Sequence, residues 1–127
     1  MVQPLETGTP DEQFENLRQR FRERMKAEQR QLATLNKALG SADIAEISIF
    51  LDIKEFAHRL RGAALVFGFQ GLGDEARAVE LAATAASLHA NREPRNPSVI
   101  TAMQALTTTL AAQIDAGAMI LNSVERI

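Results

Sequence analysis

A single histidine stands among residues that could support chemistry on an anion, in the stretch EFAHRLRGAALVFGF (Glu55–Phe69). His58 is followed three residues later by Arg61 and four residues later by Gly62. An unperturbed imidazole is mostly neutral near neutral pH, so its free nitrogen is a nucleophile without a separate base. A guanidinium can hydrogen-bond and neutralise an oxyanion such as a phosphoryl group. This pattern favours capture and release of a phosphoryl group on His58.

His58 is predicted to face outward if its segment is helical, because each helical residue turns the side chain by about 100°. The opposite side of such a helix carries the apolar residues Ile53, Phe56, Leu60, Ala63, Ala64 and Phe67. The side of His58 carries Leu51, Lys54, Arg61, Gly62 and Leu65. An exposed histidine needs no function in most helices, so its neighbours must carry the argument.

Those neighbours are typical of a docking surface around a reactive group. A glycine inside a helix costs about 1 kcal/mol relative to alanine, and Gly62 leaves bare backbone beside the imidazole, where a large partner can approach. Lys54 adds to the positive field of Arg61, while Leu51 and Leu65 supply apolar contacts. We therefore predict that His58 accepts the phosphoryl group and that Leu51, Lys54 and Leu65 bind the partner.

The elements that must position these residues are predicted to be helices. Apolar residues recur at three- and four-residue steps in four stretches, from Phe14 to Leu39, from about Ala42 to Phe67, from Phe69 to Ala90 and from Val99 to Val124. The second stretch leaves open a separate short helix over residues 43–48, with the main helix starting at about Leu51. We expect an all-α, antiparallel up-down-up-down four-helix bundle.

The boundaries follow from proline, glycine and capping residues. Residues 1–10 contain two prolines and a glycine and are predicted to form an N-terminal arm, with the domain over residues 11–127. Thr9 or Asp11 can cap the first helix, and Gly40 and Gly68 can end the first and second. The glycines of GFQGLG are predicted to form a helix stop and a tight turn rather than a dinucleotide-binding loop.

Composition excludes several classes of function. The net charge is −2 with both signs mixed along the chain, so neither nucleic acid nor a membrane surface is an expected partner. The chain has no cysteine, which removes disulfides and thiolate metal sites, and we expect no metal site. It shows no secretory leader and no apolar run of about 18 residues. We expect a cytoplasmic protein.

The stretch AHRLRGAALVFGFQGL resembles the histidine phosphotransfer (Hpt) domain family. The positions of the family motif are occupied by His58, Leu60, Arg61, Gly62, Ala63, Ala64, Gly68 and Leu72. Val79 and Glu80 match the hydrophobic residue and glutamate that often follow in the next helix. Two departures are Arg61, where the family more often has lysine, and Leu65, where it usually has a small residue.

The resemblance implies a phosphocarrier in a multistep two-component phosphorelay rather than an enzyme. His58 would accept the phosphoryl group from a receiver-domain aspartate of a hybrid histidine kinase and pass it to a response regulator, or work in reverse. The receiver would supply the acidic pocket and the Mg²⁺, so this chain would need no metal or nucleotide cofactor. Family members of this type are expected to be monomeric.

Two other functions stay open at this stage. A helical adaptor could bind a receiver domain or another signalling partner through Leu51, Gly62 and Leu65 without covalent chemistry. A dimerising phosphoacceptor domain of a histidine kinase usually has an acidic residue directly after the histidine, where this chain has Arg59. The second histidine, His89, has no glycine one turn later and is not predicted to be functional.

Overall fold

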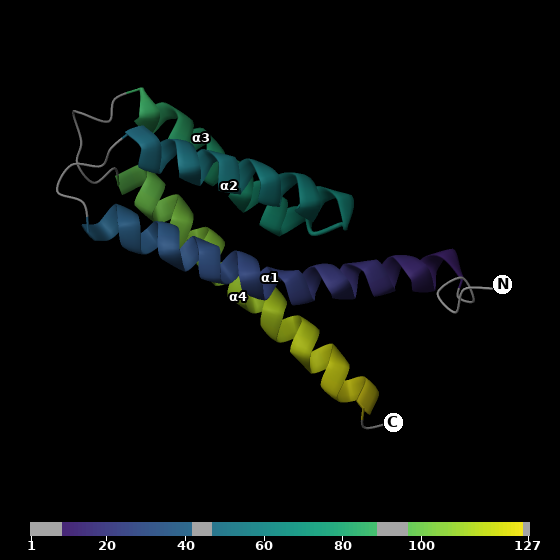
Figure 1. The fold of residues 1–127 in the computed structure, drawn as a ribbon. Coiled ribbons are helices and arrows are strands. Elements are labelled where there is room, and N and C mark those ends of the chain that lie inside the picture. Colours follow the sequence, from purple (N-terminus) through teal and green to yellow (C-terminus); the bar gives the residue numbers. More distant parts are fainter. Residues whose placement is uncertain (1–8, 42–46, 89–96, 126–127) are drawn as a thin grey trace.

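A computed structural model describes residues 9–41, 47–88 and 97–125. These residues form the helices α1 (Pro10–Ser41), α2 (Ile47–Val66), α3 (Gln70–Ser87) and α4 (Pro97–Glu125). Consecutive helices run in opposite directions (Figure 1). The all-α antiparallel four-helix bundle predicted from the sequence is confirmed.

Helix α2 corrects one expectation about the segment before His58. It runs without a break from Ile47, so the alternative in which the main helix starts at about Leu51 is wrong. Phe50 is fully buried and Ile49 packs against the core, so these apolar residues belong to the same continuous helix. Residues 42–46, which include most of the proposed short helix, lie outside the described residues.

The start of α1 is set by a capping box. The Glu12 backbone N–H donates to Thr9 Oγ1 at 3.1 Å, and the Thr9 backbone N–H donates to Glu12 Oε2 at 3.4 Å. Pro10 occupies the first helical position, where its missing N–H costs nothing. Of the two predicted caps, Thr9 is therefore the one that begins the helix. Residues 1–8 of the predicted arm lie outside the described residues.

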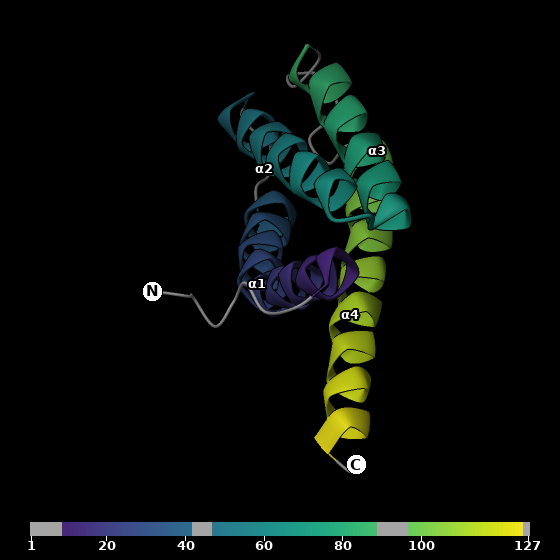
Figure 2. The same cartoon turned by 90° about the vertical axis from the view of Figure 1, so that its right-hand side faces the viewer.

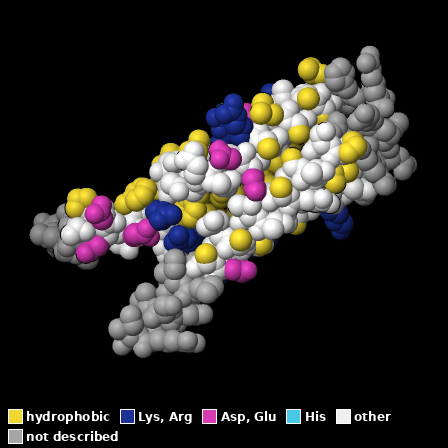
Figure 3. Space-filling view, turned by 180° about the vertical axis from the view of Figure 1, so that it is seen from behind, with side chains coloured by type: hydrophobic (Ala, Val, Ile, Leu, Met, Phe, Trp, Pro, Cys, Tyr) yellow, Lys and Arg dark blue, Asp and Glu magenta, His cyan; other side chains and the backbone are white. Residues whose placement is uncertain are grey.

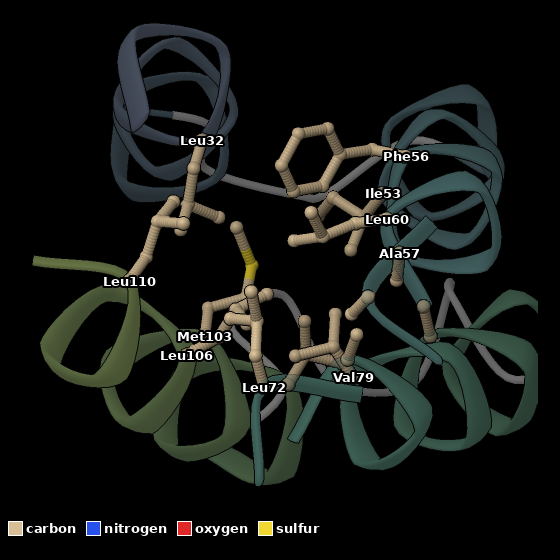
Figure 4. Close-up of a cluster of buried hydrophobic side chains, with 14 of the residues drawn as sticks. Leu32, Ile53, Phe56, Ala57, Leu60, Leu72, Val79, Met103, Leu106 and Leu110 are labelled. Carbon is tan, nitrogen blue, oxygen red and sulfur yellow. The ribbon is translucent and has the colours of Figure 1, made fainter. Parts of the chain in front are cut away.

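The core lies where all four helices meet, and it fixes the orientation of α2. Ile53, Phe56, Leu60 and Ala64 are buried as predicted, while Ala63 and Phe67 are partly buried. Figure 4 shows the α2 side chains pointing toward Leu32 of α1, Leu72 and Val79 of α3, and Met103, Leu106 and Leu110 of α4. Each large side chain of this kind contributes about 1.5–3 kcal/mol by leaving water, so the inward face of α2 is strongly specified.

Helices α2 and α3 form the closest pair in the bundle. They lie side by side in both views, and their contact is the most extensive between any two described helices (Figures 1 and 2). Ala76, Ala83 and Ala86 of α3 are buried, and small residues let neighbouring helices approach closely. The contact between α1 and α2 is much smaller. Residues of α2 and α3 therefore meet along one continuous seam.

The first turns of α1 extend beyond the α2–α3 pair (Figure 1). Phe14 and Leu17 continue the apolar spacing of α1, yet they are 44% and 45% exposed because no helix covers them there. Acidic, basic and hydrophobic side chains are interleaved along this part of the molecule (Figure 3). None of the described helices has the length and apolar content needed to cross a membrane.

Further along, α1 anchors the connection between α2 and α3. Arg18 Nε donates to the Phe67 carbonyl oxygen at 2.9 Å. The guanidinium groups of Arg18 and Arg22 lie 4.7 and 5.1 Å from the centre of the Phe69 ring, within the range of cation–π attraction. Phe21 stacks on Phe67 with ring centres 5.2 Å apart. These contacts hold the turn, and with it the relative position of α2 and α3.

Candidate functional site

The turn after α2 brings α3 back alongside α2, at the edge of the face that carries His58. Gly68 has a φ of +79°, a conformation that glycine adopts without strain. The Phe69 N–H donates to the Ala64 carbonyl at 2.8 Å and the Gly68 N–H donates to the Leu65 carbonyl at 3.3 Å, which is a Schellman motif. The predicted helix stop at Gly68 is confirmed. Gly71 and Gly73 lie inside α3 instead of forming part of the turn.

His58 faces solvent, as its helical phase predicts. Its side chain is 73% exposed, whereas the neighbouring Ala57 is fully buried and Leu60 is 2% exposed. Helix α2 therefore has one side buried in the core, and the side that carries the His58 ring is open to solvent. A large partner can reach it without any rearrangement of the bundle.

Glu80 of α3 orients the imidazole. The Nδ1 atom of His58 lies 3.2 Å from both Glu80 Oε1 and Glu80 Oε2, and the Glu80 side chain is 18% exposed. A carboxylate is an acceptor only, so Nδ1 carries the hydrogen and donates it to Glu80. The other ring nitrogen, Nε2, then holds the free lone pair. This arrangement makes Nε2 the nucleophilic atom of the ring.

A shallow hollow of about 300 Å³ surrounds this pair, lined by Leu51, Lys54, Glu55, His58 and Glu80. It brings two of the predicted binding residues, Leu51 and Lys54, together with His58. Leu51 is 48% exposed and presents apolar surface. Lys54 has no hydrogen bond or ion pair with the residues that the structure describes, so its ammonium group can meet an anion.

The other predicted residues lie beyond this hollow, toward the end of α2. Arg61 is partly buried and forms no ion pair within the described part of the chain. Gly62 is exposed, and a Cβ built on it would meet no atom within 4 Å. Leu65 is 44% exposed. The predicted face thus forms a strip along α2, with the hollow at one end and Leu65 at the other.

Glu80 and Glu55 are the residues of this site to which the sequence reasoning assigned no role. Glu80 was matched only as a motif position, although it follows the buried Val79 and therefore points about 100° away from the core centre of α3. In this structure that side faces α2, and the sequence separation of 22 residues from His58 to Glu80 allows one tight turn between them. Helical phase alone assigns Glu80 to one side of α3, and only the register between α2 and α3 places it beside the imidazole.

No metal-binding cluster accompanies the site among the described residues, where no three His, Asp or Glu side chains are grouped to hold an ion. The second histidine, His89, lies outside those residues. The ionisable side chains that line the hollow are those of Lys54, Glu55, His58 and Glu80.

Comparison with known protein families agrees with this geometry. The family model described as Hpt domain matches residues 16–116, which is most of the chain. The protein belongs to the histidine phosphotransfer domain family, whose members carry phosphoryl groups in two-component phosphorelays. No curated protein and no solved structure gives a significant match to the chain.

Proposed function

We propose that this protein is a phosphocarrier that accepts a phosphoryl group on Nε2 of His58 from a receiver-domain aspartate and passes it to the receiver domain of a response regulator. The observation that carries the proposal is the exposed His58 ring with its Nδ1 atom bonded to Glu80. In a member of this family, such a ring has its nucleophilic nitrogen directed away from the bundle. The first donor is a hybrid histidine kinase.

The transfer conserves charge without a separate base. The Nε2 lone pair attacks the phosphorus atom of the aspartyl phosphate in line with the leaving oxygen, an N–P bond forms, and the P–O bond to the aspartate breaks. The aspartate leaves as a carboxylate. The phosphorylated ring keeps its Nδ1 hydrogen and gains a positive charge, which the Glu80 carboxylate balances at 3.2 Å.

The cations of α2 assist at the phosphoryl oxygens. Arg61 supplies a planar donor set that suits a phosphoryl group, and Lys54 adds a second positive charge from the hollow. Gly62 leaves the helix surface open beside the ring, and Leu51 and Leu65 contact the receiver on either side of it. Nothing in this scheme requires a nucleotide or a metal ion on this chain, because the Mg²⁺ belongs to the receiver.

We further propose that the protein acts as a monomer in the cytoplasm, as a stoichiometric intermediate rather than an enzyme. It does not bind nucleic acid or membranes. Mass measurement in solution checks the first point, since a kinase phosphoacceptor domain must dimerise to complete its bundle.

The decisive experiment is phosphotransfer profiling against the receiver domains of the source organism. The wild type should acquire a label that is acid-labile and base-stable, and His58→Gln should acquire none. His89→Gln is the matched control and should be labelled like the wild type. If no receiver labels the wild type, or if His58→Gln keeps its label, the proposal is wrong.

A non-catalytic adaptor is the alternative function, and the same strip on α2 would serve it. In that case receivers would bind the wild type and His58→Ala with similar affinity, and neither protein would be labelled. Binding and labelling measured on the same samples separate the two functions.

A further inference from the structure

We propose that Gly73 of α3 is a positioning residue that seats Leu65 on the His58 face and thereby helps to set which receiver domains can dock. The inference rests on the phosphocarrier function proposed above. It assigns a role to a glycine that lies outside the predicted binding strip.

The Leu65 side chain fills the space that a side chain at position 73 would need, where α2 packs against α3. A Cβ built on Gly73 would lie 2.9 Å from Leu65 Cδ2 and 3.2 Å from Leu65 Cγ. Carbon atoms in contact normally stay about 3.5–4.0 Å apart. Any side chain at position 73 would therefore push Leu65 out of its present place. Leu65 lies where it does because residue 73 has no side chain.

The backbone gives no other reason for this glycine. Gly68 is the only described residue with a positive φ, so Gly73 has a conformation that alanine adopts equally well. Gly73 is buried inside α3, where glycine carries a cost in helix stability relative to alanine. The room that it leaves for Leu65 offsets that cost with a contact that α3 could not otherwise make.

Leu65 is placed to contact a partner of His58. It follows His58 by seven residues, which is two helical turns or about 10 Å along the axis. Leu51 precedes His58 by the same interval. Leu65 is 44% exposed, so part of the side chain rests on α3 and the remainder is presented to solvent. A side chain already held in one position loses less entropy when a partner binds.

The partner that fits this surface is a receiver domain with an apolar depression opposite Leu65. A receiver shaped for a small residue at that position would meet the leucine as a steric obstacle. This is consistent with the departure of position 65 from the small residue usual in the family. The Leu65–Gly73 pair is then a specificity element separate from the reacting groups His58 and Glu80.

The test compares Gly73→Ala with Gly71→Ala. Both add one methyl group near the start of α3, but a Cβ at Gly71 would meet no atom within 4 Å. We expect Gly73→Ala to raise KM for the preferred receiver about fivefold, with kcat nearly unchanged. Gly71→Ala should match the wild type. Direct labelling of His58 by phosphoramidate, a small donor that needs no docking, should be the same in all three proteins.

Leu65→Ala and the double variant Leu65→Ala/Gly73→Ala complete a double-mutant cycle with the wild type and Gly73→Ala. Once Leu65 is truncated, the added methyl at position 73 has nothing to displace, so the double variant should have the KM of Leu65→Ala. This comparison also decides the matter if Gly73→Ala alone does not fold. A KM higher in the double variant than in Leu65→Ala would contradict the proposal.

These measurements distinguish a failure of the Gly73 inference from a failure of the proposed phosphocarrier function. If the wild type receives label and Gly73→Ala has the same KM, the role of Gly73 is refuted while the phosphocarrier function stands. If Gly73→Ala lowers phosphoramidate labelling as much as receiver transfer, the glycine supports the reactive ring rather than docking, and the inference is also wrong. If no receiver labels the wild type, the phosphocarrier function itself fails and the inference falls with it.

Discussion

The two faces of α2 differ in their surroundings: one packs against the other helices and the other is open to solvent. The inward face, with Phe56, Leu60 and Ala64, is buried against the other three helices. On the outward face, His58 meets the chain through Glu80, and nothing lies within 4 Å of a Cβ built on Gly62. The residues of the inward face are thus explained by the fold, and those of the outward face are the ones that the proposed phosphocarrier function would use.

Leu65 is the informative exception on the outward face. It is packed against Gly73 and still 44% exposed, so it belongs both to the α2–α3 seam and to the surface. The contrast between the faces predicts that substitutions on one side change stability and that those on the other change phosphotransfer. The following variants test that separation.

The largest effect is expected on the inward face. Leu60 is 2% exposed, and Leu60→Ala should lower the free energy of unfolding by about 2–5 kcal/mol, because it removes buried methyl groups and leaves a cavity. Chemical denaturation measures this loss. Leu51→Ala, on the outward face of the same helix, is the control and should cost less than about 1 kcal/mol. Equal losses at the two positions would contradict the division of α2 into a structural and a functional face.

The next effect concerns the ring itself. Glu80→Gln removes the negative charge beside Nδ1, and we expect the rate of transfer to His58 to fall about tenfold, the amount that corresponds to about 1.4 kcal/mol from a charged hydrogen bond. Labelling by phosphoramidate should fall in parallel, because the lost hydrogen bond is to the ring that both donors phosphorylate. Glu55→Gln changes the same kind of group in the same hollow and should leave phosphoramidate labelling intact. If both variants behave alike, overall charge rather than the hydrogen bond is responsible.

Much of this arrangement could be predicted from the sequence, because it depends on periodicity. The spacing of Phe56, Leu60 and Ala64 alone determines that His58 faces outward, and the structure agrees. Gly68 was predicted as a helix stop because glycine tolerates the positive φ found there. These features are local, and each can be derived from one helix at a time.

The remaining features depend on how two helices are placed against each other. The Glu80–His58 hydrogen bond and the Leu65–Gly73 contact cross the α2–α3 seam, and both depend on the relative register of the two helices. The prediction that Gly73 belongs to a tight turn was wrong for the same reason. The sequence around it is typical of a turn, and only the packing of α3 against α2 explains a glycine inside the helix. The exposure of Phe14 and Leu17 likewise depends on where the neighbouring helices end.

A smaller effect is expected at Arg61. Arg61→Gln should slow transfer from a receiver about threefold to tenfold, since charged hydrogen bonds at partly solvent-exposed sites contribute modestly. Arg61→Lys keeps the charge and should retain most of the rate. Arg59→Gln is the matched control, because Arg59 donates to Gln31 Oε1 at 2.9 Å on the α1 side of the helix. A rate for Arg59→Gln as low as that of Arg61→Gln would mean that net charge, and not the place of Arg61, governs transfer.

The smallest effect, at Gly62, separates the two faces most directly because its two consequences have opposite signs. Gly62→Ala should stabilise α2 by up to about 1 kcal/mol, since the added methyl meets no atom of the chain, and should raise Tm by a few degrees. Transfer from a receiver should slow about twofold to threefold, because the methyl stands where the partner approaches. Gly40→Ala, another open position, should leave transfer unchanged. A Gly62→Ala protein that gains stability and transfers at the wild-type rate would show that no partner comes close to this backbone, and the outward face would then need another explanation for its glycine.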